Sequence, residues 1–208
     1  MVMESYRDYM FILSPPAQIA VQVKKFKLAS ERLIGDFEGL HSKAHITLKN
    51  LRRQKPFFTE PLLEQIEKEL SLIEPFVLQL NGFAHFLPTD YTTIYAAIKS
   101  TPEMEDWFRR LRKCLEEKKA VPHLTIARQV PDLQAKKLWP KFKNRAWDDE
   151  FEVDRLTILY RETFGGSKHW QPFREIRFKG NPVLNKWVDK KKEAKPDKLI
   201  DLDQTSLF

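Results

Sequence analysis

The sequence has few cysteines and few glycines, and both shortages exclude classes of site. Cys114 is the only cysteine among 208 residues, so the chain can form neither an internal disulfide nor a thiolate metal cluster. None of the six glycines lies in a G-x-x-x-x-G-K or G-x-G-x-x-G pattern, which excludes phosphate binding by a P-loop or a Rossmann turn. The low cysteine content agrees with a reducing compartment.

Long apolar runs are also missing. The longest uncharged stretches, residues 10–23 and 75–89, fall short of the roughly 18 apolar residues that a membrane-spanning helix needs. Glu4 and Asp8 stand where a secretory leader would be positively charged. We therefore expect no membrane association and a cytoplasmic location.

Charged residues are abundant, and they favour anionic partners. The chain is 31% charged and 42% hydrophobic, with a formal net charge of +7, which is the composition of a globular protein with a basic surface. Such an excess of Lys and Arg suits nucleic acid, phosphorylated metabolites or an anionic membrane surface, and charge alone does not choose among them.

The hydrophobic pattern predicts two successive βαβαβ halves, at about residues 5–86 and 91–180. We expect strands at 6–13, 44–50, 75–83, 92–98, 122–130, 150–161 and 173–178, with helices between most of them. The same order in both halves indicates an internal duplication. From about residue 185 the periodicity ends and charge increases, which predicts a flexible tail over 185–208.

Two helices are expected to bury one apolar stripe each. Steps of three and four residues align one set of apolar side chains in the first helix and another in the second. The predicted inward residues are Ile19, Val23, Phe26, Ala29 and Leu33 in the first helix, and Leu62, Ile66, Leu70 and Ile73 in the second.

The same four-residue phrase occurs in the third element of each half. It reads His45-Ile46-Thr47-Leu48 in the first half and His123-Leu124-Thr125-Ile126 in the second. Since alternate residues of a strand share a face, each His and its Thr are expected on one side and the aliphatic residues in the core. If the halves pack about a pseudo-twofold axis, both pairs converge on one site.

These residue types suit acid/base chemistry on a phosphodiester. An imidazole titrates near neutral pH, so a pair of them can supply a base and an acid together. Thr hydroxyls can donate hydrogen bonds to the non-bridging phosphate oxygens. By strand alternation Lys49 would share the face of His45 and Thr47 and either assist phosphate binding or be an ordinary exposed lysine.

The paired phrases HITL and HLTI, in the contexts HITLKNL and PHLTIAR, resemble the 2H phosphoesterase superfamily, in particular its 2′-5′ RNA ligase and RNA cyclic phosphodiesterase branch. The resemblance covers about residues 5–180. It implies a single bilobal α+β domain over 1–184, in which two antiparallel sheets flank a central cleft. It also implies metal-independent catalysis by His45 and His123, with Thr47 and Thr125 holding the phosphate.

The resemblance suggests a substrate and one further phosphate contact. Members of this family often open RNA 2′,3′-cyclic phosphates to 2′-phosphates, and some join RNA through 2′-5′ bonds. Arg128 matches an Arg that often follows the second phrase, but regular alternation would place it opposite His123, so a bulge or a strand end is needed. No cofactor and no metal are expected.

Two other segments are candidates for contacts. His169 and Trp170 follow the Gly165-Gly166 loop, where the indole could stack on a base or simply pack. The C-terminal sequence with Gln204, Leu207 and Phe208 resembles the short peptides by which bacterial proteins dock on the replication sliding clamp; the alternative is a disordered or self-packing tail.

Other functions stay open on this evidence. A non-catalytic RNA-end binder or a clamp-associated adaptor would fit the basic composition equally well, although binding alone would not require both His-Thr pairs. An enzyme with the same pair could also act on the cyclic phosphates of small nucleotides.

Overall fold

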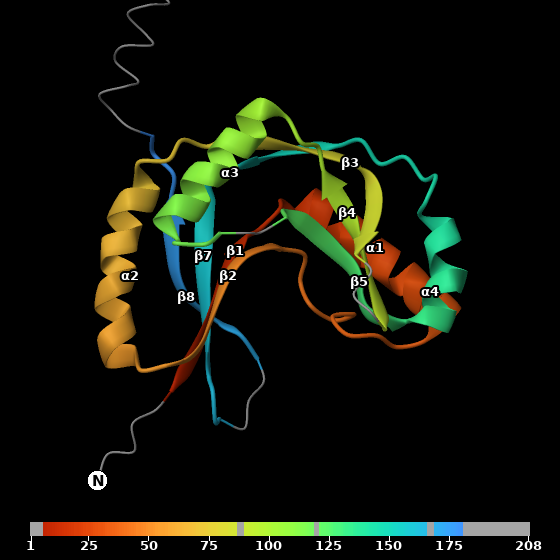
Figure 1. Ribbon diagram of the computed structural model, residues 1–208, viewed down its shortest axis with the longest axis horizontal. Helices are drawn as coiled ribbons and strands as arrows, with labels where there is room; N and C mark the ends of the chain where they lie inside the picture. Colours follow the sequence, from red (N-terminus) through yellow and green to blue (C-terminus); the bar gives the residue numbers. More distant parts are fainter. Residues whose placement is uncertain (1–5, 87–89, 119–120, 166–168, 181–208) are drawn as a thin grey trace, which may run out of the picture.

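Two antiparallel sheets of four strands form the framework of the protein (Figure 1). The computed structural model describes residues 6–86, 90–118, 121–165 and 169–180. The first sheet has the order β2-β1-β7-β8, and its strands are β1 (Arg7–Leu13), β2 (Ile46–Gln54), β7 (Arg155–Glu162) and β8 (Gln171–Arg177). The second has the order β5-β4-β3-β6, with β3 (Phe76–Phe86), β4 (Tyr91–Ile98), β5 (His123–Pro131) and β6 (Glu150–Val153). The expected α+β class with two antiparallel sheets is confirmed.

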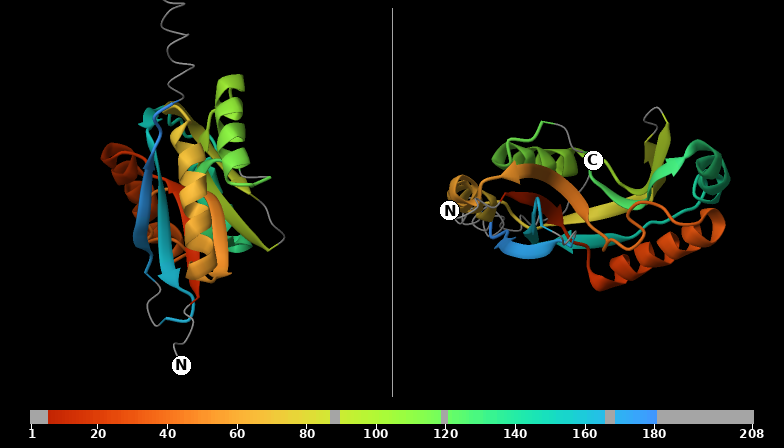
Figure 2. Two further views of the ribbon diagram at one scale, coloured as in Figure 1. Left: turned by 90° about the vertical axis from the view of Figure 1, so that its left-hand side faces the viewer. Right: turned by 90° about the horizontal axis from the view of Figure 1, so that it is seen from below.

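Helices flank both sheets. They are α1 (Ala17–Ile34), α2 (Pro56–Ser71), α3 (Pro102–Cys114) and α4 (Asp132–Leu138), followed by a short 3₁₀ turn at Trp139–Lys141. α2 lies beside β8 and α3, whereas α1 and α4 lie together beside the second sheet (Figures 1 and 2). None of the helices in the described ranges is long and apolar enough to span a lipid bilayer.

Each sheet combines strands from both halves of the sequence. β3, from the first half, pairs with β4 and β6, while β7, from the second half, pairs with β1. The division of the chain at about residue 90 therefore does not coincide with the division into two sheets. The first half of the chain contributes strands to both sheets, and so does the second half.

The segment expected as one strand over residues 150–161 is two strands in different sheets. β6 pairs with β3 and β7 pairs with β1, so the chain changes sheets at Asp154. The carbonyl of Asp154 accepts a hydrogen bond from Phe178 N at 2.8 Å, and its carboxylate binds Arg155 Nε at 2.8 Å. A single run of β-forming residues does not reveal such a crossing, because both pieces have strand periodicity.

The helical stripes were predicted correctly only in part. In α1 the buried stripe contains Ile19, Val23 and Phe26, but then continues through Ser30 and Ile34, while Leu33 is 43% exposed and Ala29 is exposed. In α2, which begins at Pro56, Leu62 is 59% exposed and its neighbour Leu63 is buried instead. At the ends of a stripe the 3.6-residue period drifts, so packing against the sheet decides which neighbour is buried.

A large part of the core forms where α3 meets β3. Trp107 is fully buried, stacks on Phe76 with ring centroids 5.2 Å apart, and donates Nε1–H to Glu74 O at 2.9 Å. α3 begins with a side-chain cap, since Met104 N donates to Thr101 Oγ1 at 3.2 Å, as the Thr-Pro sequence predicts. This packing fixes the sheet that carries the second His-Thr phrase.

Candidate active site

The two His-Thr phrases lie on edge strands that contact each other. β2 is the edge of the first sheet and β5 the edge of the second, and the two strands are in contact. His123 begins β5, and His45 immediately precedes β2. Upstream of β2, Glu38 forms a backbone bridge to Arg128 of β5, and their side chains form an ion pair at 3.5 Å.

The register of both strands places the four side chains on one face of each sheet. Thr47 opposes Ile12 of β1, whereas Thr125 opposes Tyr95 and His123 opposes Ala97 of β4. The intervening aliphatic residues are buried, while His45, Thr47, His123 and Thr125 are half-buried. We call the side of the two sheets that carries these four residues the motif face.

A bulge follows the Thr of each phrase. In β2, Thr47 opposes Ile12 and Lys49 opposes Phe11, which leaves Leu48 as an extra residue. In β5, Thr125 opposes Tyr95 and Ala127 opposes Ile94, which leaves Ile126 extra. Each bulge reverses the alternation of side chains beyond it.

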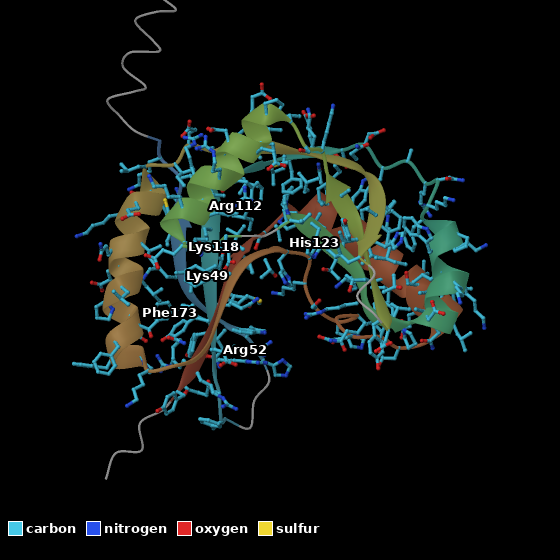
Figure 3. All side chains as sticks on the ribbon, in the orientation of Figure 1. Lys49, Arg52, Arg112, Lys118, His123 and Phe173 are labelled. Atoms are coloured by element: carbon cyan, nitrogen blue, oxygen red, sulfur yellow. The ribbon has the colours of Figure 1, made fainter. Side chains whose placement is uncertain are left out.

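The bulge in β2 corrects the expectation for Lys49. Because Lys49 opposes Phe11, it lies on the face opposite Thr47, and its ammonium donates to Leu115 O at the end of α3. Asn50, which opposes Met10, occupies the motif face instead. The regular alternation assumed from sequence was wrong here, so that argument for a phosphate contact by Lys49 no longer holds. Figure 3 shows Lys49 among the cationic side chains near the end of α3.

The bulge in β5 brings Arg128 to the motif face. Ala127 opposes Ile94 and Val130 opposes Thr92, so Arg128 and Gln129 together oppose Thr93. A positive charge on Arg128 lowers the pKa of both His45 and His123, which places the guanidinium near both imidazoles. The bulge that the sequence argument required for Arg128 is therefore present.

Both imidazoles are held by the same local hydrogen bond. His45 Nδ1 lies 2.8 Å from Lys43 O, and His123 Nδ1 lies 2.7 Å from Val121 O, in each case the carbonyl two residues earlier. A carbonyl only accepts, so Nδ1 carries the hydrogen and donates it. In the neutral ring Nε2 then has a free lone pair. It can accept a proton as a general base, and once protonated it can donate that proton as a general acid.

The surroundings disfavour the charged form of both imidazoles. Burial is the largest cause of the lowered pKa of His45, and the hydrogen bond to Lys43 O acts in the opposite direction. Positive charges on Lys27 and His123 also lower the pKa of His45, in addition to Arg128. Burial likewise lowers the pKa of His123, with a further contribution from Arg128 and opposition from the hydrogen bond to Val121. A bound phosphodiester would raise both pKa values by its negative charge.

Lys27 is a part of the site that sequence reasoning missed. This side chain of α1 is 3% exposed, and its ammonium donates to Gly39 O at 2.6 Å, Ser42 O at 2.9 Å and Ser42 Oγ at 2.9 Å. Burial lowers the pKa of Lys27 to about 8. Lys27 lies four residues after Val23, on the buried face of α1, and only its packing against residues 39–42 shows that the ammonium has partners there.

Aromatic rings surround His123 and not His45 among the described contacts. Tyr95 lies 5.0 Å and Phe86 lies 5.2 Å from the His123 ring, between centroids, and Tyr95 stacks on Phe86 at 4.3 Å. Tyr95 and Phe86 cover one side of the His123 ring, so a substrate has to approach the ring from another side.

The remaining candidates lie further away or outside the described residues. Trp170 is half-buried beside the guanidinium of Arg161, and His169 is exposed. Gln204, Leu207 and Phe208 fall outside the described ranges, as does the expected tail from 185 onward. Within those ranges no three His, Cys, Asp or Glu side chains cluster so as to hold a metal ion.

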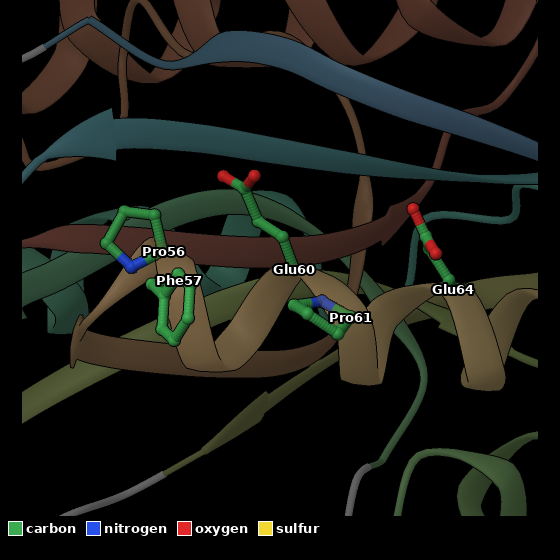
Figure 4. A pocket seen from close by; sticks show the side chains of 5 residues that line it. All are labelled: Pro56, Phe57, Glu60, Pro61 and Glu64. Carbon is green, nitrogen blue, oxygen red and sulfur yellow. The ribbon is translucent and has the colours of Figure 1, made fainter.

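One surface hollow lies away from the histidines. It has a volume of about 450 Å³, lies along α2, and is lined by Pro56, Phe57, Glu60, Pro61 and Glu64 (Figure 4). Its carboxylates would repel a phosphate, and it offers no imidazole. We therefore build the candidate site on the motif face.

Comparison with known proteins identifies the class of this chain. Residues 15–163, which include both phrases, match the family model of the 2′-5′ RNA ligase superfamily. The chain belongs to this superfamily, which is of the 2H phosphoesterase type.

Individual relatives agree with this assignment. A Bacillus cytotoxicus protein named "Putative phosphoesterase" is 32% identical over 126 residues, which cover 56% of this chain and 70% of that protein. A Bacillus mycoides protein with the same description is 29% identical over 126 residues, with the same shares covered.

Two solved structures share the fold at low sequence identity. Escherichia coli LigT in complex with phosphate superposes with a TM-score of 0.60 at 14% identity, covering 84% of this chain and 98% of LigT. The Thermus thermophilus protein TT0787 gives a TM-score of 0.59 at 16% identity, covering 83% of this chain and 98% of that protein.

Proposed function

We propose that this protein is a metal-independent phosphoesterase that acts on RNA ends and opens a terminal 2′,3′-cyclic phosphate to a 2′-phosphate. The observation that carries the proposal is the pair of His-x-Thr phrases on contacting edge strands, each with Nδ1 held by a carbonyl and Nε2 left for chemistry. Solved structures of LigT, which shares this fold, contain phosphate or 3′-AMP.

The residues divide the reaction between them. One neutral imidazole takes a proton from water through Nε2 as the water oxygen attacks phosphorus. The bond between phosphorus and O3′ breaks, and the second imidazole, protonated, gives its proton to O3′. Thr47 and Thr125 donate hydrogen bonds to the non-bridging oxygens, and Arg128 offsets the growing negative charge. With an RNA 5′-hydroxyl in place of water as the nucleophile, the same forward steps break the bond between phosphorus and O3′ and join RNA through a 2′-5′ bond.

The unequal surroundings of the two imidazoles assign the roles. His45 is affected by the positive charges of Lys27 and Arg128, whereas His123 is affected by Arg128 without Lys27. The positive charge of Lys27 therefore opposes protonation of His45 in particular. We infer that His45 is the general base and His123 the general acid in hydrolysis.

The test is hydrolysis of a short RNA that ends in a 2′,3′-cyclic phosphate, in EDTA, with the product end identified. Wild type should turn over and leave a 2′-phosphate, while His45→Ala and His123→Ala should each lose about 10²- to 10⁴-fold of the rate. His41→Ala is the matched control, because His41 is an exposed histidine just before the site. Undiminished turnover in either variant contradicts the mechanism. Turnover of mononucleoside cyclic phosphates alone would assign a small-nucleotide substrate, and RNA binding without turnover would assign a binding role.

A further inference from the structure

A second cluster of polar and aromatic side chains lies on the motif face of the first sheet. The guanidinium carbon of Arg161, on β7, lies 4.7 Å from the centroid of the Trp170 ring. Arg161 Nε and Nη2 both donate to Asp8 Oδ2, at 3.1 and 3.0 Å. The carboxylate thus fixes the guanidinium in the place where it covers the indole.

The register of β1 shows that this pair faces the same way as Thr47. β1 pairs with β7 without interruption from Arg7 to Ile12, and Asp8 opposes Arg161. Asp8 and Ile12 are four residues apart and so share a face, and Ile12 opposes Thr47 on its other side. At the rise of a β-strand the two positions are about 13 Å apart along β1.

The chemistry of the pair suits a base better than a phosphate. Asp8 is 5% exposed and also accepts hydrogen bonds from Arg53 N at 3.0 Å and Thr163 Oγ1 at 2.8 Å. Burial acts to raise the pKa of Asp8, but these hydrogen bonds and Arg161 outweigh it and lower the pKa. The carboxylate therefore stays ionised and offsets the charge of Arg161, which leaves a flat, nearly neutral surface.

Cationic side chains that could bind the phosphates of a nucleic acid strand lie beside this surface. Arg52 and Arg53 are exposed at the end of β2, the strand that carries Thr47, and Figure 3 shows Arg52 there. An aromatic surface for bases next to cations for phosphates is the combination that single-stranded nucleic acid binding uses.

We propose that Trp170, held by Arg161 and Asp8, is a stacking platform for a base of the RNA strand upstream of the reacting phosphate. The inference rests on the proposed function. Because Asp8, which holds the platform, lies about 13 Å along β1 from Ile12, the partner of Thr47, the platform meets a preceding nucleotide rather than the terminal one. The enzyme should accordingly prefer an oligonucleotide to a mononucleotide.

The experiment compares two substrates, an RNA tetramer and a mononucleoside, each with a 2′,3′-cyclic phosphate. We expect wild type to have the higher kcat/KM on the tetramer, and Trp170→Ala to reduce this preference by roughly 5- to 150-fold, as loss of one stacked base predicts. Trp170→Phe should keep most of the preference. Phe57→Ala is the matched control, because Phe57 is an aromatic residue on α2 that is 83% exposed. Thermal melting of each variant checks that the fold is kept.

Binding separates this inference from the proposed function. Calorimetry with the tetramer carrying a 2′-phosphate should show weaker binding to Trp170→Ala than to wild type, whether or not the cyclic ends are hydrolysed. If wild type hydrolyses neither substrate, the proposed function is wrong, and the binding comparison still tests the platform. If the substrate preference and the tetramer affinity are the same in Trp170→Ala and wild type, the platform is wrong and the proposed reaction stands.

Discussion

The two motif strands share a backbone design but differ in what surrounds it. β2 and β5 each present a His whose Nδ1 binds the carbonyl two residues earlier, a Thr on the same face, and a bulge immediately after the Thr. Three residues beyond the Thr, β2 places Asn50 on the motif face and β5 places Arg128.

The histidines also have different neighbours. The buried ammonium of Lys27 acts on His45, while Tyr95 and Phe86 enclose His123. The two His-Thr phrases are alike in sequence and backbone, but their neighbours differ. These neighbours give the two histidines different chemical properties. Acid/base catalysis needs such a difference, since one group has to start neutral and the other protonated.

The largest expected effect comes from removing either imidazole. His45→Ala and His123→Ala should each reduce kcat about 10²- to 10⁴-fold, which is the usual contribution of a general acid or base. Because the two act in one step, the double variant should lose much less than the product of the two losses. Single-turnover rates on the RNA 2′,3′-cyclic phosphate measure this, and multiplicative losses would show that the histidines act independently.

The two Thr residues test whether the phosphate is held symmetrically. Thr47→Val and Thr125→Val keep the shape but remove the hydroxyl, and each should lower kcat/KM by roughly 10- to 150-fold, the equivalent of one hydrogen bond to a charged group. Thr→Ser at the same positions should restore most of the activity. Equal losses at the two sites would indicate a phosphate centred between the strands, whereas loss at one site alone would place it on that strand.

The unequal charge on the two histidines is measurable by NMR titration. His45 should titrate at a lower pH than His123, because Lys27 is protonated below its pKa of about 8 and so is positive throughout the imidazole range. Lys27→Met removes this charge and should raise the pKa of His45 more than that of His123. The charges that act on His45 are Lys27 from α1 and His123 and Arg128 from β5, so Arg128→Gln is the matched control and should raise both pKa values. An unchanged pKa of His45 in Lys27→Met would show that the charge of Lys27 does not act on His45.

The smallest expected effect is the change in the free energy of unfolding with pH. Both histidines have folded-state pKa values below the unfolded value near 6.5, so the unfolded chain binds more protons in this range. The free energy of unfolding should therefore be unaffected by these groups above about pH 6.5 and fall as pH drops from there through the folded-state pKa values. Urea unfolding at a series of pH values measures the slope, and His45→Gln with His123→Gln should flatten it.

The sequence alone predicted much of the fold and the central part of the site. The alternation of apolar and polar residues predicted the order of strands and helices, because burial on one face imposes a period of two on a strand and 3.6 on a helix. The repeated His-x-Thr phrase pointed to the four residues that the structure brings onto the motif face of two contacting strands.

Other features were decided by tertiary structure. The change of sheets at Asp154 depends on which strands β6 and β7 pair with, and both pieces have the same local pattern. The bulges after Thr47 and Thr125 are visible only in the cross-strand register, and they move Lys49 off the motif face and Arg128 onto it.

Lys27 shows the same limit in a single residue. A lysine is usually solvated, but Lys27 lies on the buried face of α1, where the carbonyls of Gly39 and Ser42 accept hydrogen bonds from its ammonium. The sequence by itself therefore determined which chemical groups are present and which local elements carry them. Tertiary structure decided which groups act on one another, because electrostatic interaction depends on distance and burial, and strands far apart in the chain set both.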